Sequence, residues 1–278
     1  MKQGKRLATA SAVGVLIFLS AVAFCVLLWR VQSEPPAGES PASFRIKGRE
    51  STSRLNAVPI LLYHNLNGKG IFSLDSEILR GHFQMLRDRG IRVIGLPDFI
   101  SHMEKPSRSP GKAVAITFDD GFYAMYTALM PIAASFGYPI TLFIYTDIIY
   151  TRAQKSLTWD RLAEMEKNGI SAESHSVSHA DLVRLLEKGG EDTRRRLFEE
   201  IYLSKRIMEL YLQKRIRYFA FPYGRYNLPL IRLCQLAGYE RVLSTDYGPN
   251  ILTRNNYCLR RRHIKRDYDF SLIEKIVE

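Results

Sequence analysis

Two adjacent carboxylates follow the most strand-like stretch of the sequence. Residues Ala113–Phe118 are mostly apolar and half β-branched, which predicts a buried strand. Asp119 and Asp120 come next, and Gly121 then supplies a turn. Because chemistry in parallel α/β folds gathers at the carboxyl ends of strands, we expect both carboxylates at such an edge, with their side chains on different sides. Taken alone, an acidic turn without chemistry is the simpler explanation.

Two histidines lie four residues apart after another short predicted strand. His175 and His179 enclose Ser176 and Ser178, which favour a turn or a helix start. Residues four apart face the same way when the backbone turns helically. A His-x-x-x-His pattern is a weak signal by itself, although the chain has only six histidines. Two imidazoles and one carboxylate would form a facial ligand set for Zn²⁺ or another divalent metal, with positions open for water and substrate.

A third stretch, Arg217–Gly224, is typical of a strand that runs into a turn of Pro222, Tyr223 and Gly224. The proline fixes the local backbone. An exposed backbone N–H beside it could stabilise an oxyanion.

Strand-like and helix-like stretches alternate from Ala57 onward. The predicted strands are Val58–Tyr63, Arg92–Leu96, Ala113–Phe118, Tyr138–Tyr145, Gly169–Ser174, Ile216–Phe221, Tyr239–Ser244 and Tyr257–Ile264. The predicted helices are Asp75–Arg89, Asp98–Glu104, Tyr123–Phe136, Leu157–Lys167, Glu191–Leu212 and Leu228–Ala237. This alternation predicts parallel βα units, and about eight strands suit a (β/α) barrel, with a doubly wound open sheet as the alternative.

The N-terminal 30 residues predict a short cytoplasmic stub and a transmembrane signal-anchor. Leu7–Trp29 carries no charge and is long enough for a helix to cross the ~30 Å hydrocarbon core. Bases precede it, so the positive-inside rule places the rest of the chain outside the cytoplasmic membrane. Ala21–Ala23 resembles a signal-peptide cleavage site, but the apolar run continues past it, which favours the anchor.

Residues 31–56 are polar and lack an apolar period, which predicts a flexible linker before a catalytic domain over residues 57–278. The net charge of +12 comes with no nucleic-acid motif, so solvated basic faces explain it and no nucleic-acid partner is expected. Cys234 and Cys258 could pair in an oxidising compartment or remain free thiols.

Three motifs, in this order, resemble the polysaccharide deacetylase family, also known as carbohydrate esterase family 4 or the NodB homology domain. They are Thr117–Gly121, His175–His179 and Phe219–Gly224. The segment Val58–His64 is similar to the opening strand of the branch that acts on poly-β-1,6-N-acetylglucosamine. The resemblance covers about residues 57–265 and implies a distorted (β/α)₇₋₈ barrel that removes acetyl groups from N-acetylated sugars.

The same resemblance assigns roles to the motif residues. It implies that Asp119 is the general base, that the metal ligands are Asp120, His175 and His179, and that Tyr223 contributes its backbone N–H to an oxyanion hole. These roles agree with the chemistry of amide hydrolysis, which needs an activated water, a proton acceptor and a stabilised oxyanion.

The sequence departs from the family pattern at two places. The arginine that orients the base in many members is replaced by Ala220, and Arg261 on the last predicted strand can take its place. The general acid is expected to be either His263, two residues after Arg261 on the same strand face, or His64 at the end of the first strand. Both remain open.

Three residues are expected to line the sugar-binding groove. Pro222 and Tyr223 belong to the third motif, and Asp246 follows a strand, although an ordinary turn explains Asp246 equally well.

The expected function is hydrolysis of linear amides: removal of N-acetyl groups from N-acetylglucosamine-containing polysaccharide at the outer side of the cytoplasmic membrane, with release of acetate. A divalent metal is the expected cofactor, zinc first, with cobalt, nickel or iron as alternatives. Exopolysaccharide synthesis or export proteins are candidate partners. Two alternatives stay open: an inactive glycan-binding barrel that scaffolds an export complex, and the same chemistry on peptidoglycan or chitin oligomers.

Overall fold

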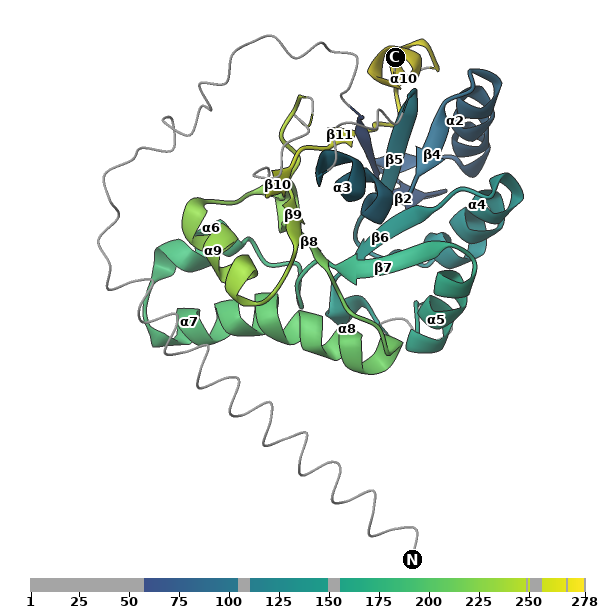
Figure 1. Ribbon diagram of the computed structural model, residues 1–278. Coiled ribbons are helices and arrows are strands. Elements are labelled where there is room, and N and C mark those ends of the chain that lie inside the picture. The colour runs from purple at the N-terminus through teal and green to yellow at the C-terminus, as the bar shows by residue number, and fades with distance from the viewer. Residues whose placement is uncertain are drawn as a thin grey trace, which may run out of the picture.

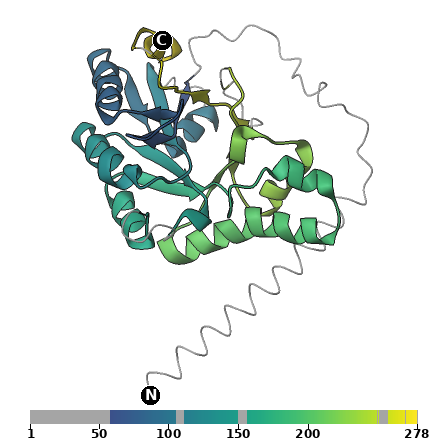
Figure 2. The ribbon, with the colours of Figure 1, turned by 180° about the vertical axis from the view of Figure 1, so that it is seen from behind.

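The computed structural model of the protein describes residues 58–104, 111–149, 156–248, 250, 257–268 and 270–277 (Figures 1 and 2). Within these ranges no helix combines the length and the apolarity that a membrane crossing requires. The predicted anchor and linker, residues 1–56, lie outside the described residues.

Parallel strands form the centre of the molecule. In chain order, the main sheet contains β1 (Ile60–Tyr63), β4 (Arg92–Ile94), β5 (Ala113–Phe118), β6 (Ile140–Ile144), β7 (Ile170–Ser174), β8 (Tyr218–Ala220), β9 (Arg241–Leu243), β10 (Cys258–Leu259) and β11 (Arg262–His263). Their spatial order is β10-β9-β8-β7-β6-β5-β1-β11, with β4 on the first half of β5. A small second sheet joins β2 (Asn65–Leu66) to β3 (Ser73–Leu74).

The last strand segment links the two ends of the sheet. β10 pairs with β9, and β11, three residues further on, pairs with β1. Strand order follows chain order from β5 to β10 and does not reverse at a switch point, as a doubly wound sheet would. These pairings confirm a parallel α/β fold of the barrel type. The single strand predicted over Tyr257–Ile264 is instead two short strands, because the segment changes its pairing partner at Arg260 and Arg261.

The helices are α2 (Ser76–Asp88), α3 (Leu96–Glu104), α4 (Met130–Phe136), α5 (Trp159–Lys167), α6 (Leu182–Lys188), α7 (Glu191–Phe198), α8 (Ser204–Leu212), α9 (Leu228–Leu236) and α10 (Phe270–Val277). Most of them cover the outside of the curved sheet (Figure 1), whereas the buried side chains of α3 cluster with those on the inner face of the strands. The π-helical segments η2 (Met125–Leu129) and η5 (Glu199–Leu203) continue into α4 and α8, and η3 (Thr146–Ile148) and η6 (Pro222–Gly224) are single 3₁₀ turns. The short elements β2, β3, α6 and α10 were not predicted from the sequence.

The alternation of side chains along β5 decides where its carboxylate points. Val114, Ile116 and Phe118 pack with the helices in the larger apolar cluster, whereas Ala113 and Ala115 belong to the interior cluster. Side chains two apart on a strand share a face. Asp119 therefore continues the interior-facing series, and its side chain is buried above the barrel core.

Candidate active site

Asp119 forms a buried ion pair with Arg261. The two guanidinium nitrogens Nη1 and Nη2 donate to the carboxylate oxygens Oδ1 and Oδ2, both at 2.7 Å. Each of the two residues is 2% exposed. The Arg261 Nε donates to the Ser244 carbonyl at 3.0 Å, which fixes the plane of the guanidinium. Burial would raise the pKa of Asp119, but Arg261, with a smaller effect from His175, outweighs it and holds the pKa below its usual value.

Asp120 reaches the same site through an unusual backbone conformation. Its φ of 75° lies in the left-handed region, which non-glycine residues rarely adopt. This conformation turns its carboxylate toward the histidines, so the expectation that Asp119 and Asp120 point to different sides is wrong. The Asp120 Oδ1 lies 3.6 Å from His175 Nε2 and 3.3 Å from His179 Nε2, and the Asp119 Oδ2 lies 3.9 Å from His175 Nε2.

His175 is held in one tautomer by its neighbour strand. Its Nδ1 lies 2.8 Å from the carbonyl oxygen of Ala220, and a carbonyl can only accept, so Nδ1 carries the proton. In the neutral ring, Nε2 is therefore the lone-pair nitrogen, and it faces Asp120. Metal-binding histidines commonly have such a bond on the opposite ring nitrogen. Ala220 thus contributes to the site through its main chain.

The loop between the two histidines is not the helical turn that the sequence suggested. Ser176 and His179 both have left-handed backbones, with φ of 76° and 60°. The His179 N–H donates to the Ser176 hydroxyl at 3.0 Å, which closes a tight local turn. Folding back in this way, rather than helical spacing, brings the two imidazole rings to a centroid distance of 4.9 Å.

These groups fit a divalent metal. Asp120, His175 and His179 present one ligand atom each, and these atoms all lie within 4.8 Å of one another. Two neutral imidazoles and one carboxylate suit zinc or a similar ion, with coordination positions left for other ligands. His175 is almost fully buried, and its hydrogen bond to Ala220 fixes the orientation of the ring. Metal binding would therefore cost little side-chain entropy at this residue.

The third motif forms a strained turn beside His179. Tyr223 has a φ of 59°, is 60% exposed and packs edge-on against the His179 ring at 4.6 Å. Gly224 also has a positive φ, and a Cβ there would lie 2.0 Å from the Thr245 hydroxyl oxygen. Pro222 is buried at the start of this turn. The structure thus places the Pro222–Gly224 turn next to the metal-ligand candidates.

His64 and His263 lie together rather than on opposite sides of the site. Their ring centroids are 5.2 Å apart, and the Phe72 ring packs on both, at 5.1 Å and 4.9 Å. His64 Nδ1 and His263 Nε2 are buried without a hydrogen-bond partner among the described residues. Burial lowers the pKa of His64, against the charges of Asp119 and Asp120, and burial together with His64 and Arg261 lowers the pKa of His263 to about 4.

Comparisons with known proteins indicate the family of this chain. A family model described as polysaccharide deacetylase matches residues 107–242. The chain carries a polysaccharide deacetylase domain. It is 27% identical over 228 residues to YxkH of Bacillus subtilis (strain 168), named after the same family, covering 82% of this chain and 78% of that protein. It is 21% identical over 253 residues to the poly-β-1,6-N-acetyl-D-glucosamine N-deacetylase of Escherichia coli (strain K12), covering 74% of this chain but 38% of that relative.

Solved structures show the same fold. The Streptococcus pyogenes deacetylase PplD in complex with acetate aligns with a TM-score of 0.70 at 22% sequence identity, covering 80% of this chain and 98% of that chain. At this level of identity the likeness establishes the fold of the deacetylase domain.

Asp246, expected at the sugar, is exposed at the end of β9 in the deacetylase domain. Its carboxylate accepts a hydrogen bond from the Tyr226 hydroxyl at 2.6 Å. This bond holds the segment after β9 against the segment after η6. Contact of Asp246 with a sugar stays a prediction. Cys234 and Cys258 are free thiols, so the pairing left open above does not occur.

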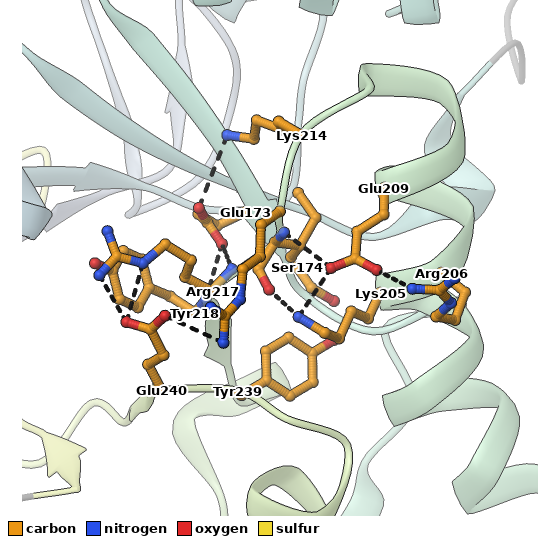
Figure 3. Close-up of polar contacts among 12 residues, drawn as sticks. Glu173, Ser174, Lys205, Arg206, Glu209, Lys214, Arg217, Tyr218, Tyr239 and Glu240 are labelled. Carbon is orange, nitrogen blue, oxygen red and sulfur yellow. Dashed lines mark hydrogen bonds and ion pairs between the residues drawn. The ribbon is translucent and has the colours of Figure 1, made fainter. Parts of the chain in front are cut away.

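Sequence reasoning missed the buried carboxylate that joins β7 to β8 in the deacetylase domain (Figure 3). Glu173 is 3% exposed and accepts hydrogen bonds from the backbone N–H groups of Arg217 and Tyr218, both at 2.8 Å. The two strands share one registered residue pair, so the carboxylate bridges them where their ladder is short. Burial raises the pKa of Glu173 to about 7, against the Lys214 ammonium. The interior-facing period of β7 was the one available signal for this residue.

Proposed function

We propose that this chain is a metal-dependent N-deacetylase that releases acetate from N-acetylglucosamine-containing polysaccharide. The polysaccharide deacetylase domain provides the reaction class. The observation that carries the finer proposal is the convergence of Asp120, His175 and His179 within 4.8 Å, directly beside the buried Asp119. A hydrolytic centre needs both a metal position and an ionised carboxylate that is not itself a ligand.

The residues divide the work of amide hydrolysis among them. A metal held by Asp120, His175 and His179 would lower the pKa of a bound water and polarise the acetyl carbonyl. Asp119 accepts the proton of the attacking water, and its bidentate pair with Arg261 keeps the carboxylate ionised and oriented. The Tyr223 backbone N–H donates to the oxygen that develops negative charge.

We assign the general acid to His64 in this proposal. Support comes from its surroundings: burial lowers the pKa of His64, but the charges of both Asp119 and Asp120 oppose that effect, whereas burial, His64 and Arg261 lower the pKa of His263 to about 4. His263 and Phe72 both pack on the His64 ring. His64 would deliver the proton to the departing nitrogen, and His263 would hold the ring in place.

The poly-β-1,6-N-acetylglucosamine assignment is proposed from the names of the relatives. The Escherichia coli relative named for that substrate is much longer than the part that this chain matches. Peptidoglycan and chitin fragments offer the same acetamido group, so they are the comparison substrates for any assay.

Acetate release by the purified chain from these three N-acetylated glycans, with and without a chelator, tests the proposal. Asp119→Asn keeps the shape of the site and its ligands, so it should retain the metal and lose turnover by about 10²-fold or more. Asp120→Asn should lose metal and turnover together. Full turnover in the chelated chain would refute metal dependence, and the reverse pattern for the two variants would exchange their roles.

We further propose that residues 7–29 anchor the enzyme in the cytoplasmic membrane with residues 57–278 outside. Support comes from the uncharged apolar run and the bases that precede it. The full-length protein should then sediment with membranes, and protease added from outside should digest the catalytic domain while the N-terminus stays protected. A soluble mature form starting near Phe24 would refute the anchor in favour of a cleaved signal.

A further inference from the structure

The loop that carries both histidines is held by hydrogen bonds on two sides. At its start, the His175 N–H donates to Ile144 O at 2.8 Å. Its carbonyl groups at Ser176 and Val177 accept from the N–H groups that follow β6, at 3.2 and 2.9 Å. These bonds fix one side of the loop to β6. They leave the N–H groups of Val177 and Ser178, on the other side, to be satisfied elsewhere.

One buried carboxylate satisfies that other side. Glu200 Oε2 accepts from the N–H of Val177 at 3.0 Å and from the N–H of Ser178 at 2.9 Å. Glu200 Oε1 accepts from the Ser178 hydroxyl at 2.5 Å. Glu200 is 2% exposed, and none of its bonds is with the residues that would touch substrate or metal. Three donors of one short loop therefore converge on a single side chain.

The helix that supplies Glu200 is itself fixed to the strand that precedes the loop. Glu200 lies in the π-helical segment η5, between α7 and α8, and π-helical turns often occur at functional sites. One turn later, the Ser204 hydroxyl lies 3.0 Å from the Ser174 hydroxyl on β7, next to His175. Tyr239 from the segment before β9 donates to Ile201 O at 2.9 Å and holds the same turn. The carboxylate is thereby placed rigidly behind the loop.

We propose that Glu200 is a positioning residue of the metal site, which holds the loop Ser176–His179 in the conformation that directs both imidazoles at one ion. This inference rests on the proposed metal site. Ser176 and His179 have left-handed backbones that the loop would leave if its hydrogen bonds were lost. Without the carboxylate, the ring of His179, the ligand at the far end of the loop, loses its fixed direction.

The same helix offers a matched control (Figure 3). Glu209 in α8 also accepts a backbone N–H, that of Ile216 at 3.2 Å, and pairs with Lys205 at 3.1 Å. Its partners lie on α8 itself and on the connection to β8, and none lies on the histidine loop. Glu209→Gln therefore removes a half-buried charge from the same helix without touching the loop.

The test measures zinc affinity of the metal-free full chain by competition with a chromophoric chelator. Outer-sphere partners of metal ligands typically contribute 10–100-fold to affinity. We expect Glu200→Gln, whose amide oxygen can still accept, to weaken zinc binding by about 10-fold, and Glu200→Ala by about 100-fold. The zinc affinity of Glu209→Gln should stay within about 2-fold of that of the unaltered chain, because the hydrogen bond that it loses does not support the histidine loop.

A second readout follows the loop itself. Hydrogen–deuterium exchange of the peptide that contains Val177 and Ser178 should accelerate in metal-free Glu200→Gln and stay unchanged in Glu209→Gln. Unaltered zinc affinity and exchange in the Glu200 variants would overturn the inference. If the unaltered chain bound no zinc, the metal site itself would be refuted, and the exchange measurement would still show whether Glu200 orders the loop.

Discussion

Replacement of Arg261 by methionine is the perturbation that tests the catalytic base most directly. The substitution keeps a long buried side chain but removes both 2.7 Å hydrogen bonds to Asp119 and the Nε bond to Ser244. Charge-assisted hydrogen bonds contribute about 1.5–3 kcal/mol each, and removal of one partner of a buried ion pair costs about 3–5 kcal/mol. We therefore expect the free energy of unfolding to fall by about 3–5 kcal/mol.

The same change should move the pH dependence of turnover. Burial raises the pKa of Asp119, and Arg261 is the main group that opposes this effect. A carboxylate beside an arginine typically has its pKa lowered by about 1–3 units, so loss of Arg261 should raise the pKa of Asp119 by a similar amount. Because Asp119 must be ionised to accept a proton, the acid limb of the pH–rate profile should shift upward by about 1–3 pH units.

Urea unfolding and acetate release across pH measure the two effects. Arg261→Lys keeps the charge but only part of the fork, so it should fall between the unaltered chain and Arg261→Met. The double variant Asp119→Asn/Arg261→Met should be less destabilised than the sum of the single variants, because no unpaired charge stays buried. An Arg261→Met variant with unaltered stability and an unmoved acid limb would refute the role given to this pair.

Three further predictions concern other parts of the fold. His64→Ala should reduce turnover by about 10²-fold and flatten the alkaline limb of the pH–rate profile. His263→Ala should lower turnover but keep that limb. The opposite result would make His263 the general acid. His82 is fully buried, and burial lowers its pKa to about 4, so on acidification the unfolded state binds the proton first. As the pH drops from about 6.5 to 4, the free energy of unfolding should therefore fall by about 3 kcal/mol more in the unaltered chain than in His82→Gln, measured by urea unfolding. Parallel pH curves for the two proteins would contradict this. Gly224→Ala combines a positive φ with a steric clash and should lower the free energy of unfolding by about 2–4 kcal/mol. Gly238 also has a positive φ but faces open space, so Gly238→Ala should lower it by about 1 kcal/mol. Thermal unfolding measures both, and equal losses would show that the clash at Gly224 is relieved.

The strands that carry the site could be predicted from local pattern. Ala113–Phe118 was predicted with its observed bounds, because a fully buried strand must be apolar throughout and a glycine turn ends it. The predicted helix Glu191–Leu212 corresponds to α7, η5 and α8 in succession. Its π-helical segment was not predicted, because the apolar pattern of a helix does not show where its hydrogen bonds lengthen to the π-helical spacing.

The candidate site was predicted in its residue types and missed in its supports. The three motifs contain the carboxylates and imidazoles, and the structure brings Asp119, Asp120, His175 and His179 together. Glu200 escaped prediction because a glutamate on an amphipathic helix looks like a solvated residue. Glu200 is buried because its face of the helix packs on the histidine loop. The sequence of the helix does not show which of its faces does so.

The sequence by itself determined the chemistry that this protein can perform, because ligand and proton-transfer groups are properties of single side chains. It also determined that parallel strands would present those groups at their carboxyl ends. The tertiary structure alone decided their partners. Arg261 lies 142 residues from Asp119, and the two meet because β11 pairs with β1 and so brings the last strand segment over the barrel interior. The left-handed turn at Asp120 likewise depends on surrounding contacts that outweigh its local preference, and only the folded chain supplies them.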